Sequence, residues 1–373
     1  MRFADVPGLY EIKNVLANAI NEQQVAHAQL FLSAKGALNL PLAIAYASYL
    51  HCTNKTGTDS CGTCAACSKS LKFIHPDTHF IFPLSNVLKE SDEDKQKANI
   101  LKLWRNFLLE KPYGDEDDWL SFYGGEDKQA NISKETARDI IKSLSLKPFE
   151  SNYKVMIIWM PEYMHPSAAN AILKILEEPA AQTVFLLVTN QAEKLLPTIL
   201  SRTQIHSVPL LDDIELQSYL TDKLGFEKSK VESIITLAEG SINRAVKIMD
   251  NAEEDNRQTF TEWMRSCFKR EYDQLIKFSE QFHESDKLSQ RNFFDYSLHI
   301  LRESLVHISG AGTNRMRGED LDFVGKFSSV MNLQRVDHLY NLINEASYHL
   351  ERNGSAKMIF LDLSIQISQK LNS

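Results

Sequence analysis

The sequence predicts an α/β domain with a parallel, helix-covered sheet, followed by two helical domains. Short apolar runs alternate with segments of helical spacing over residues 1–208, and this alternation is typical of a parallel sheet whose faces are covered by helices. After residue 208 the strand-like runs cease and the long segments have helical periodicity. A chain of 373 residues is also longer than one typical domain, so two or three domains are expected.

Four apolar runs in the first domain have the character of buried strands, because they are short, continuous and rich in β-branched and aromatic residues. They are AQLFLS (28–33), THFIFPL (78–84), YKVMIIWM (153–160) and TVFLLVT (183–189). Three segments between these runs have helical spacing and are predicted as helices. They cover residues 37–50, 133–146 and 167–179.

Residues 88–130 interrupt this order with an acidic insertion. The stretches KESDEDKQK and YGDEDDW are strongly acidic, and one short amphipathic piece, ILKLWRNFLLE, lies between them. A run of charges is usually a solvated face, so we interpret the insertion as a solvated addition to the sheet domain. A dedicated binding element is the alternative.

Two helical regions follow the α/β domain. Residues 209–253 form a small helical unit, and the segments of residues 254–373 have helical periodicity. The latter include FFDYSLHILRESLVHI, VDHLYNLINEASYHLERN and AKMIFLDLSIQISQKL. The predicted domains therefore cover residues 1–208, 209–253 and 254–373.

The composition is that of a globular protein without a membrane segment. Hydrophobic residues make up 43% and charged residues 24% of the chain, which is ordinary for a soluble domain. The formal charge of -8 argues against DNA binding by bulk electrostatics, although a local basic face remains open. The N-terminal stretch lacks the layout of a signal peptide, and no apolar run reaches the length of a membrane span. We therefore expect a cytoplasmic protein.

Four of the five cysteines lie close together and predict a zinc site. Cys52, Cys61, Cys64 and Cys67 have the spacing C-x8-C-x2-C-x2-C, and zinc favours four thiolates at the corners of a tetrahedron. No residue that would activate a water is evident, so a closed structural site is favoured over a catalytic one. Four free thiols or a redox pair are the alternatives, and the spacing and the compartment disfavour both.

The stretch LFLSAKGALNLPLAIAYASYL (30–50) has the layout of a P-loop without its chemistry. A strand-like run leads into a small-residue turn and then into an apolar helix. A P-loop needs glycines whose neighbouring backbone N–H groups cradle phosphates, and then a Lys and a Ser or Thr. Here only Gly36 remains of the glycines, and Asn39 and Leu40 stand where the Lys and the hydroxyl belong.

Several stretches together resemble a known family. They are FADVPGLYEIKNVLANAI, VAHAQLF, the cysteine cluster behind the P-loop-like helix, HPDTHFIFP, NAILKILEEP and LLPTILSRTQ. In this order they resemble the delta-prime family of bacterial DNA polymerase III clamp-loader subunits, within the AAA+ superfamily. The resemblance spans nearly the whole chain, with residues 88–130 as the main exception.

The resemblance implies an architecture and a set of partners. It implies an AAA+ α/β domain over residues 1–208 with an inserted zinc module at about 52–67, a lid domain over 209–253 and a C-terminal oligomerisation collar over 254–373. The implied partners are the gamma/tau ATPase subunits and the delta subunit, and through the complex the sliding clamp and primed DNA. The implied location is the replisome in the cytoplasm.

Aligned on the family, both halves of the ATP site are degenerate. Asn39 and Leu40 replace the P-loop Lys and hydroxyl, while Trp159 and Met160 replace the adjacent Asp and Glu that normally end the next catalytic strand. These four changes remove the phosphate clamp, the Mg²⁺ ligands and the group that activates water. We therefore expect no productive ATP binding and no enzyme activity of the isolated chain. The resemblance implies that the chain is a subunit of the DNA polymerase III holoenzyme.

One arginine of the ATPase machinery is retained. Arg202 in LSRTQ matches the arginine of the family's Ser-Arg-Cys motif, which the resemblance implies to reach ATP held by a neighbouring subunit. Such an arginine supplied in trans can be worth ~10³ in rate. A surface or salt-bridging arginine is the alternative. Arg244 lies one residue after the family's sensor position, which is Asn243 here, so its role stays open.

The sequence therefore favours a non-hydrolysing, delta-prime-like stator of the clamp loader. The first alternative is an ATP-hydrolysing subunit of the gamma/tau type, which the residues at positions 39, 40, 159 and 160 oppose. The second is a stand-alone, zinc-containing protein that binds nucleic acid or regulates another protein, which the acidic balance disfavours.

Overall fold

The computed structural model divides the chain into two compact units, which are described separately. Unit 1 comprises residues 1–219 and 240–243, and unit 2 comprises residues 220–239 and 244–373. The structure describes residues 1–85, 93–125, 128–133, 135–136, 147–180, 182–249, 253–285, 287–310, 319–329, 331–352 and 354–371.

Unit 1 is built on a parallel sheet of five strands, in the order β2-β3-β4-β1-β5. The strands are β1 (Ala28–Ser33), β2 (Thr78–Ile81), β3 (Lys154–Trp159), β4 (Thr183–Thr189) and β5 (Gln204–Val208). The four predicted strands are confirmed. β5 is an edge strand on which only His206 and Val208 are buried, so its sequence contains no continuous apolar run.

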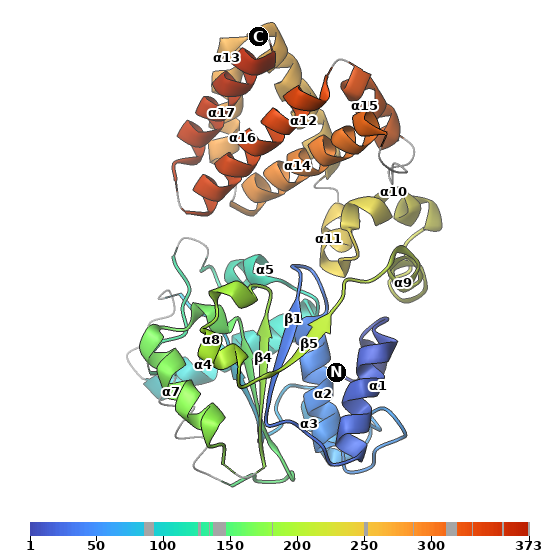
Figure 1. Ribbon diagram of the computed structural model, residues 1–373, viewed down its shortest axis with the longest axis vertical. Helices are drawn as coiled ribbons and strands as arrows, with labels where there is room; N and C mark the ends of the chain where they lie inside the picture. The colour runs from blue at the N-terminus through green and yellow to red at the C-terminus, as the bar shows by residue number, and fades with distance from the viewer. Residues whose placement is uncertain are drawn as a thin grey trace. The chain divides into compact units, whose positions relative to one another are not determined.

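Helices cover both faces of this sheet (Figure 1). α2 (Asn39–His51) packs against β1, β3 and β4, and α1 (Tyr10–Asn21) packs against α2. Every residue of α2 is buried, which explains why its sequence is apolar all round rather than striped. α7 (Pro166–Glu177) lies on the opposite face, and both of these predicted helices are confirmed.

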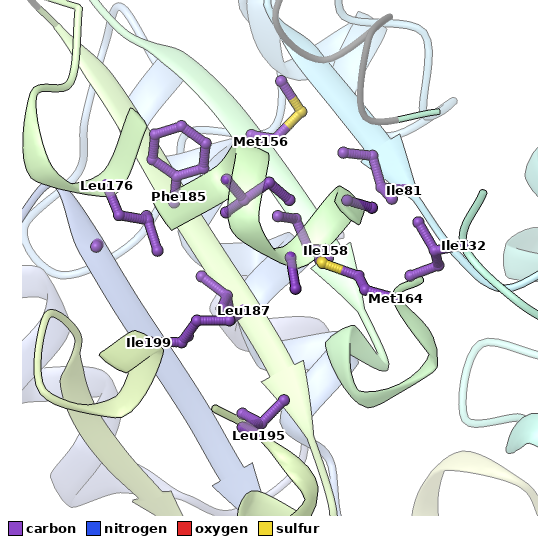
Figure 2. Close-up of a cluster of buried hydrophobic side chains, with 14 of the residues drawn as sticks. Ile81, Ile132, Met156, Ile158, Met164, Leu176, Phe185, Leu187, Leu195 and Ile199 are labelled. Atoms are coloured by element: carbon purple, nitrogen blue, oxygen red, sulfur yellow. The ribbon is translucent and has the colours of Figure 1, made fainter. Parts of the chain in front are cut away.

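The core between the sheet and α7 follows the two-residue period of the strands. Met156 and Ile158 of β3 and Phe185 and Leu187 of β4 point to the same face and are almost fully buried (Figure 2). Ile172 of α7 packs on them. The residues between them on each strand point to the face that α2 covers. A strand buried on both faces must be apolar throughout, as these runs are.

Short elements complete unit 1. They are η1 (Phe3–Asp5), α3 (Ala65–Ser70), α4 (Glu93–Glu110), α5 (Glu116–Phe122), η2 (Pro161–Tyr163), η3 (Ala192–Lys194), α8 (Pro197–Leu200) and α9 (Asp213–Ser218). The helix predicted over 133–146 lies outside the described residues, apart from positions 133, 135 and 136. Within the predicted insertion, residues 88–92 and 126–127 also lie outside them.

The insertion is not simply a solvated surface. Trp104 and Phe107 of α4 and Trp119 of α5 are fully buried, and Trp104 stacks on Phe82 with ring centroids 4.1 Å apart. The prediction of a solvated insertion is therefore wrong for this aromatic face. The acidic residues on either side of it dominate the composition and conceal the apolar positions.

Unit 2 is helical throughout its described residues, as predicted. Its elements are the π-helical turn Tyr219–Lys223, α10 (Lys228–Ala238), α11 (Ile242–Lys247), α12 (Glu253–Lys269), α13 (Tyr272–Glu284), α14 (Lys287–Ser309), α15 (Glu319–Ser329), α16 (Leu333–Glu351) and α17 (Ala356–Leu371). The turn and α11 each have residues in both units. A separate lid over 209–253 and a separate collar over 254–373 stay predictions.

Aromatic side chains fill the core of unit 2. Trp263 of α12 and Phe282 of α13 lie against Phe360 of α17, with ring centroids 4.8 and 4.4 Å away. The indole N–H of Trp263 donates to the hydroxyl of Ser364 at 2.8 Å, so its one polar atom is satisfied. Among the described residues, no helix combines the length and the apolar character needed to cross a membrane.

A buried carboxylate fixes the entry to β3. Asp77 is 1% exposed and accepts hydrogen bonds from the backbone N–H groups of Phe149, Glu150 and Ser151 at 2.5, 2.8 and 2.9 Å. Burial opposes ionisation, but these three donors outweigh it and lower the pKa of the Asp77 carboxyl below its ordinary value. The carboxylate therefore ties the start of β2 to the chain that leads into β3.

We predict that Asp77→Asn lowers the free energy of unfolding by about 2 kcal/mol at pH 7, because hydrogen bonds to a charged acceptor are the strong ones. Because the pKa of Asp77 is lower in the folded than in the unfolded chain, its ionised form stabilises the fold above the unfolded pKa of about 3.9. This stabilisation is lost as the pH falls through the folded pKa. The difference between wild type and variant should therefore shrink between about pH 5 and pH 3 in urea unfolding. Glu178→Gln, at an exposed carboxyl, is the control, and a difference independent of pH would contradict the assignment.

Candidate functional site

The turn between β1 and α2 is closed by polar side chains of the protein itself. The side-chain N–H₂ of Asn39 donates to the backbone carbonyl of Thr189 at 3.2 Å and to the side-chain carbonyl of Asn190 at 2.9 Å. The hydroxyl of Ser33 donates to the same Asn190 oxygen at 2.9 Å. Asn39 is 6% exposed. The side chain at the position of a P-loop lysine is therefore engaged with the end of β4 and does not face a ligand.

Gly36 marks the point where this turn meets another part of unit 1. Its φ is +91°, and a Cβ on Gly36 would lie 2.7 Å from the hydroxyl oxygen of Ser241. No side chain fits in that space, and the backbone conformation is one that side chains disfavour. Gly36 is therefore required by this close contact and by its backbone conformation.

The carboxyl end of β3 carries apolar side chains. Trp159 is 4% exposed and Met160 is 6% exposed, so neither presents a polar group to a ligand. Met160 has a left-handed backbone with φ 56°, and its N–H donates to the carbonyl of Val188 at 2.8 Å. The side chains at these two positions cover the carboxyl end of β3 and offer no ligand for Mg²⁺.

Glu162 lies near the carboxyl end of β3, two residues beyond Met160. Glu162 accepts a hydrogen bond from the hydroxyl of Thr189 at 2.8 Å, and burial raises the pKa of Glu162 to about 7. A carboxyl in that range has the acidity of a general base. Its hydrogen bond comes from a hydroxyl at the end of β4, so the geometry supports a structural carboxyl.

Arg202 follows α8 and is held by its own chain. Its guanidinium pairs with the carboxylate of Glu177 at 2.6 Å and donates to the carbonyl of Thr198 at 2.9 Å and the hydroxyl of Ser201 at 3.3 Å. The side chain is 34% exposed. An arginine at the surface with a single carboxylate partner is accessible to a neighbouring molecule. Its described contacts place it apart from the β1–α2 turn.

Arg244 lies in an ion-pair cluster within unit 2. Glu239 accepts from Arg302 at 2.6 Å and from Arg244 at 3.1 Å, and His299 lies 3.6 Å away. The hydrogen bond from His299, together with the two arginines, lowers the pKa of Glu239 to about 2. The neighbouring Asn243 belongs to unit 1. Arg244 thus has a structural partner, and its role toward a nucleotide stays open.

The structure brings the four predicted cysteines together. The Sγ atoms of Cys52, Cys61, Cys64 and Cys67 all lie within 4.8 Å of one another, and those of Cys61 and Cys67 are 3.9 Å apart. Four sulfurs around a zinc ion at about 2.3 Å would lie about 3.8 Å from each other. The donor set therefore fits a tetrahedral Zn²⁺. The local backbone supports it, because the N–H groups of Thr63 and Cys64 donate to the sulfur of Cys61.

The surroundings of the four thiols differ, because burial raises the pKa of Cys52 and Cys67 whereas hydrogen bonds favour the thiolate of Cys64. Burial alone raises the pKa of Cys64, but hydrogen bonds from the side chain of Thr53 and the N–H of Cys67 outweigh it and lower the pKa to about 5. Thiolate is the form that binds metal. The module is tied to the N-terminus through Asp59, which accepts from the N–H groups of Phe3 and Ala4 at 3.0 and 2.9 Å.

Some residues of these sites carry no signal in the sequence. The roles of Thr189 and Asn190 depend on the register that sets β4 beside β1, which no local pattern reveals. Asp118 is 1% exposed and accepts from the side-chain N–H₂ of Asn243 at 2.7 Å, across 125 positions of the chain. Its only local sign is the run GDEDD before a tryptophan, which is also the signal of a helix N-cap.

A family model and several known proteins match the chain. The model described as DNA polymerase III, delta subunit, matches residues 8–212. The DNA polymerase III subunit delta' of Pseudomonas aeruginosa is 26% identical over 297 residues, which are 79% of this chain and 77% of that protein. The subunit delta' of Bacillus subtilis is 28% identical over 52% of this chain and 45% of that protein.

Relatives of a second kind also match. The DNA polymerase III subunit tau/gamma of Haemophilus influenzae is 24% identical over 67% of this chain, but the chain spans only 30% of that protein. A solved structure of a DNA polymerase III gamma subunit-related protein from Thermotoga maritima also matches, with 16% identity and a TM-score of 0.39. The match covers 97% of this chain and 99% of that protein. At this TM-score the structural likeness adds nothing to the assignment.

We predict that Glu162→Gln stabilises the protein at pH 8 by about 2 kcal/mol and leaves it nearly unchanged at pH 4. The unfolded carboxyl loses its proton above about pH 4.3 and the folded one only near pH 7, so the native state loses stability over this interval. The neutral amide avoids this cost while still accepting from Thr189. Thermal unfolding at the two pH values measures the effect. Glu193→Gln, at an exposed carboxyl, is the control. Equal stability of wild type and E162Q at pH 8 would show that Glu162 is not buried as described.

Proposed function

The chain belongs to the family described as DNA polymerase III, delta subunit, and we propose that it is a non-hydrolysing, delta-prime-like stator of the clamp loader. In this role it assembles with gamma/tau ATPase subunits and a delta subunit into the ring that loads the sliding clamp onto primed DNA in the cytoplasm. The observation that carries the proposal is the engagement of Asn39 with the end of β4, at the position where an ATPase needs a free lysine.

The geometry favours the delta-prime type over the tau/gamma type, although relatives of both types match. A hydrolysing subunit needs a lysine, a hydroxyl and two acids around the nucleotide. The corresponding positions here hold Asn39, which is saturated by hydrogen bonds, and Leu40, Trp159 and Met160, which are buried. A titration of the purified chain with ATP separates the two types, because the delta-prime type gives no saturable binding.

We further propose that unit 1 is an AAA+ domain and that the C-terminal helices form the collar of the ring. The parallel sheet with helices on both faces and the helical C-terminal region are consistent with this division. A stand-alone zinc protein that acts on nucleic acid is the remaining alternative. It would fail to co-purify with gamma/tau and delta.

Arg202 is proposed to serve the ATP site of the neighbouring subunit. A guanidinium supplied in trans stabilises the charge that develops on the transferred phosphoryl group. The pair with Glu177 and the hydrogen bond to the carbonyl of Thr198 hold the guanidinium of Arg202 at the surface. An exposed ion pair of this kind is worth little, so a phosphate on the partner can displace the carboxylate.

We predict that Arg202→Ala folds and assembles normally but lowers the DNA- and clamp-stimulated ATPase of the reconstituted complex by about tenfold. Arg202→Lys should restore only part of the rate, because lysine lacks the planar fork of donors. Glu177→Gln releases the arginine without removing it and should leave the rate close to that of wild type. An unchanged rate in the Arg202→Ala complex would remove Arg202 from the mechanism, and failed assembly of wild type with gamma/tau and delta would remove the proposed function itself.

We propose that Cys52, Cys61, Cys64 and Cys67 hold one structural Zn²⁺. All four ligands come from the protein, which closes the coordination sphere, so the ion would stabilise the fold and not polarise a substrate. The ion would fix residues 52–67 against the N-terminal residues through the hydrogen bonds of Asp59.

We predict about one zinc per chain in purified protein by elemental analysis, and almost none in Cys67→Ser. Loss of the ion should also lower the melting temperature, because metal binding of this kind contributes folding free energy. Cys267→Ser is the matched control, since Cys267 is a buried thiol in unit 2 outside the cluster. Equal zinc content in the two variants would contradict the assignment.

A further inference from the structure

The insertion packs its aromatic side over the carboxyl end of β3. Trp104 of α4 lies against Trp159, the last residue of β3, with ring centroids 5.2 Å apart. Trp119 of α5 meets Trp104 edge-on at 4.9 Å, and its indole N–H donates to the carbonyl of Pro83 at 2.9 Å. In open parallel sheets, ligands bind outside the carboxyl ends of the strands. The insertion therefore covers the carboxyl end of β3, on the side of the sheet where a ligand is expected.

The acidic turn at the start of α5 reaches the turn between β1 and α2. The carboxylate of Asp117 pairs with the ammonium group of Lys35 at 3.2 Å, and the Asp117 side chain is 13% exposed. Lys35 directly precedes Gly36 in the P-loop-like turn. Figure 1 shows α5 at the end of the sheet where β1 leads into α2. An anionic group is therefore held at the turn whose counterpart in a working P-loop holds phosphates.

A second carboxylate of α5 holds residues 240–243, which belong to the same unit. Asp118 accepts from the side-chain N–H₂ of Asn243 at 2.7 Å and from the ammonium group of Lys111 at 3.3 Å. It also accepts from the backbone N–H of Asp115 at 3.0 Å, within the capping box of α5. A carboxylate that is 1% exposed needs such donors, because an unpaired buried charge is costly.

The turn and residues 240–243 also touch directly. A Cβ on Gly36 would lie 2.7 Å from the hydroxyl oxygen and 2.8 Å from the Cβ of Ser241. The side chain of Ser241 therefore occupies the space beside Gly36 that a side chain on the turn would fill. The two carboxylates lie beside this contact: Asp117 pairs with Lys35 of the turn, and Asp118 accepts a hydrogen bond from Asn243.

We propose that the insertion is a built-in occupant of the degenerate nucleotide site. The carboxylates of Asp117 and Asp118 take the place of the anionic phosphates and join the β1–α2 turn to residues 240–243. In an ATPase subunit an exchangeable nucleotide would make this connection, whereas here a covalently attached segment makes it at high effective concentration. This proposal depends on the proposed function in one respect, because it treats residues 34–41 as the remnant of a P-loop.

The local charges agree with a resident anion. Lys35 pairs with Asp117 and Lys111 pairs with Asp118, so each of these two carboxylates has a cationic partner. A nucleotide that approached the turn would meet Asp117 and Asp118, and like charges at short range repel in a partly buried site. The insertion thus both fills the site and excludes a competing anion.

Hydrogen exchange of the full chain tests the proposal. In Asp117→Asn/Asp118→Asn, backbone amides of residues 34–41 and 240–243 should exchange about tenfold faster, because the segments lose the group that joins them. Amides of β4 should be unchanged. Glu110→Gln is the matched control, since it removes an exposed carboxylate from the same insertion and should change neither segment. Millimolar MgATP should protect neither segment in the wild-type chain.

A second variant approaches the same contact from the other side. Asn243→Ala leaves the insertion intact and should raise exchange at residues 240–243 as much as Asp118→Asn does. Combined with Asp118→Asn it should add little, because both changes break the same hydrogen bond. Exchange in Asp117→Asn/Asp118→Asn equal to that of the control, additive effects of Asn243→Ala and Asp118→Asn, or protection of residues 34–41 by MgATP would overturn the proposal.

The hydrogen-exchange result does not depend on whether the chain assembles with gamma/tau and delta. The measurement uses the isolated full chain and reads two segments of unit 1, whereas the proposed stator role is read from assembly and ATPase of the complex. Slow exchange at residues 34–41 in the double variant would leave the stator role intact. Failed assembly would leave the occupied site intact.

Discussion

The complete burial of α2 across the middle of the sheet is the constraint on which the rest of unit 1 depends. A helix without a polar face must begin at a buried turn, and the N–H groups of its first turn need partners there. In nucleotide-binding relatives of this topology a phosphate meets that need. Here Asn39 accepts from the N–H of Leu40 at 2.9 Å and donates to the end of β4. The protein's own side chains supply partners at the start of the central helix.

Much of this arrangement can be predicted from the sequence, and the limits have physical causes. The three central strands β1, β3 and β4 are evident because burial on both faces requires continuous apolar runs, whereas the edge strand β5 needs only two buried positions and leaves no such run. The cysteines are evident because their ligand spacing is local. The contact of Asp118 with Asn243 is not, since it depends on the tertiary path of 125 residues.

The acidic insertion shows why composition misleads about burial. Its residues of one sign suggest a solvated surface, yet Trp104 and Trp119 are completely buried and Asp118 is enclosed by donors. A buried carboxylate costs little when several donors satisfy it, and the aromatic rings contribute the apolar area that fixes the segment. Asp77 and Glu239 follow the same rule elsewhere in the chain. In each case the number of donors decides the outcome, and the overall charge of the chain does not.

The packing of Trp159 has a consequence for the evolution of this chain. Once an indole ring and a helix of the insertion fill the edge of the sheet, an acid restored at position 159 would lose the ring contact with Trp104 and would face the same apolar surroundings. A lysine restored at position 39 would in turn leave Asn190 and the end of β4 without their donor. Each of these single substitutions would therefore lower stability. Under the proposed function, these contacts therefore oppose the return of an ATP site one residue at a time, even without selection against hydrolysis.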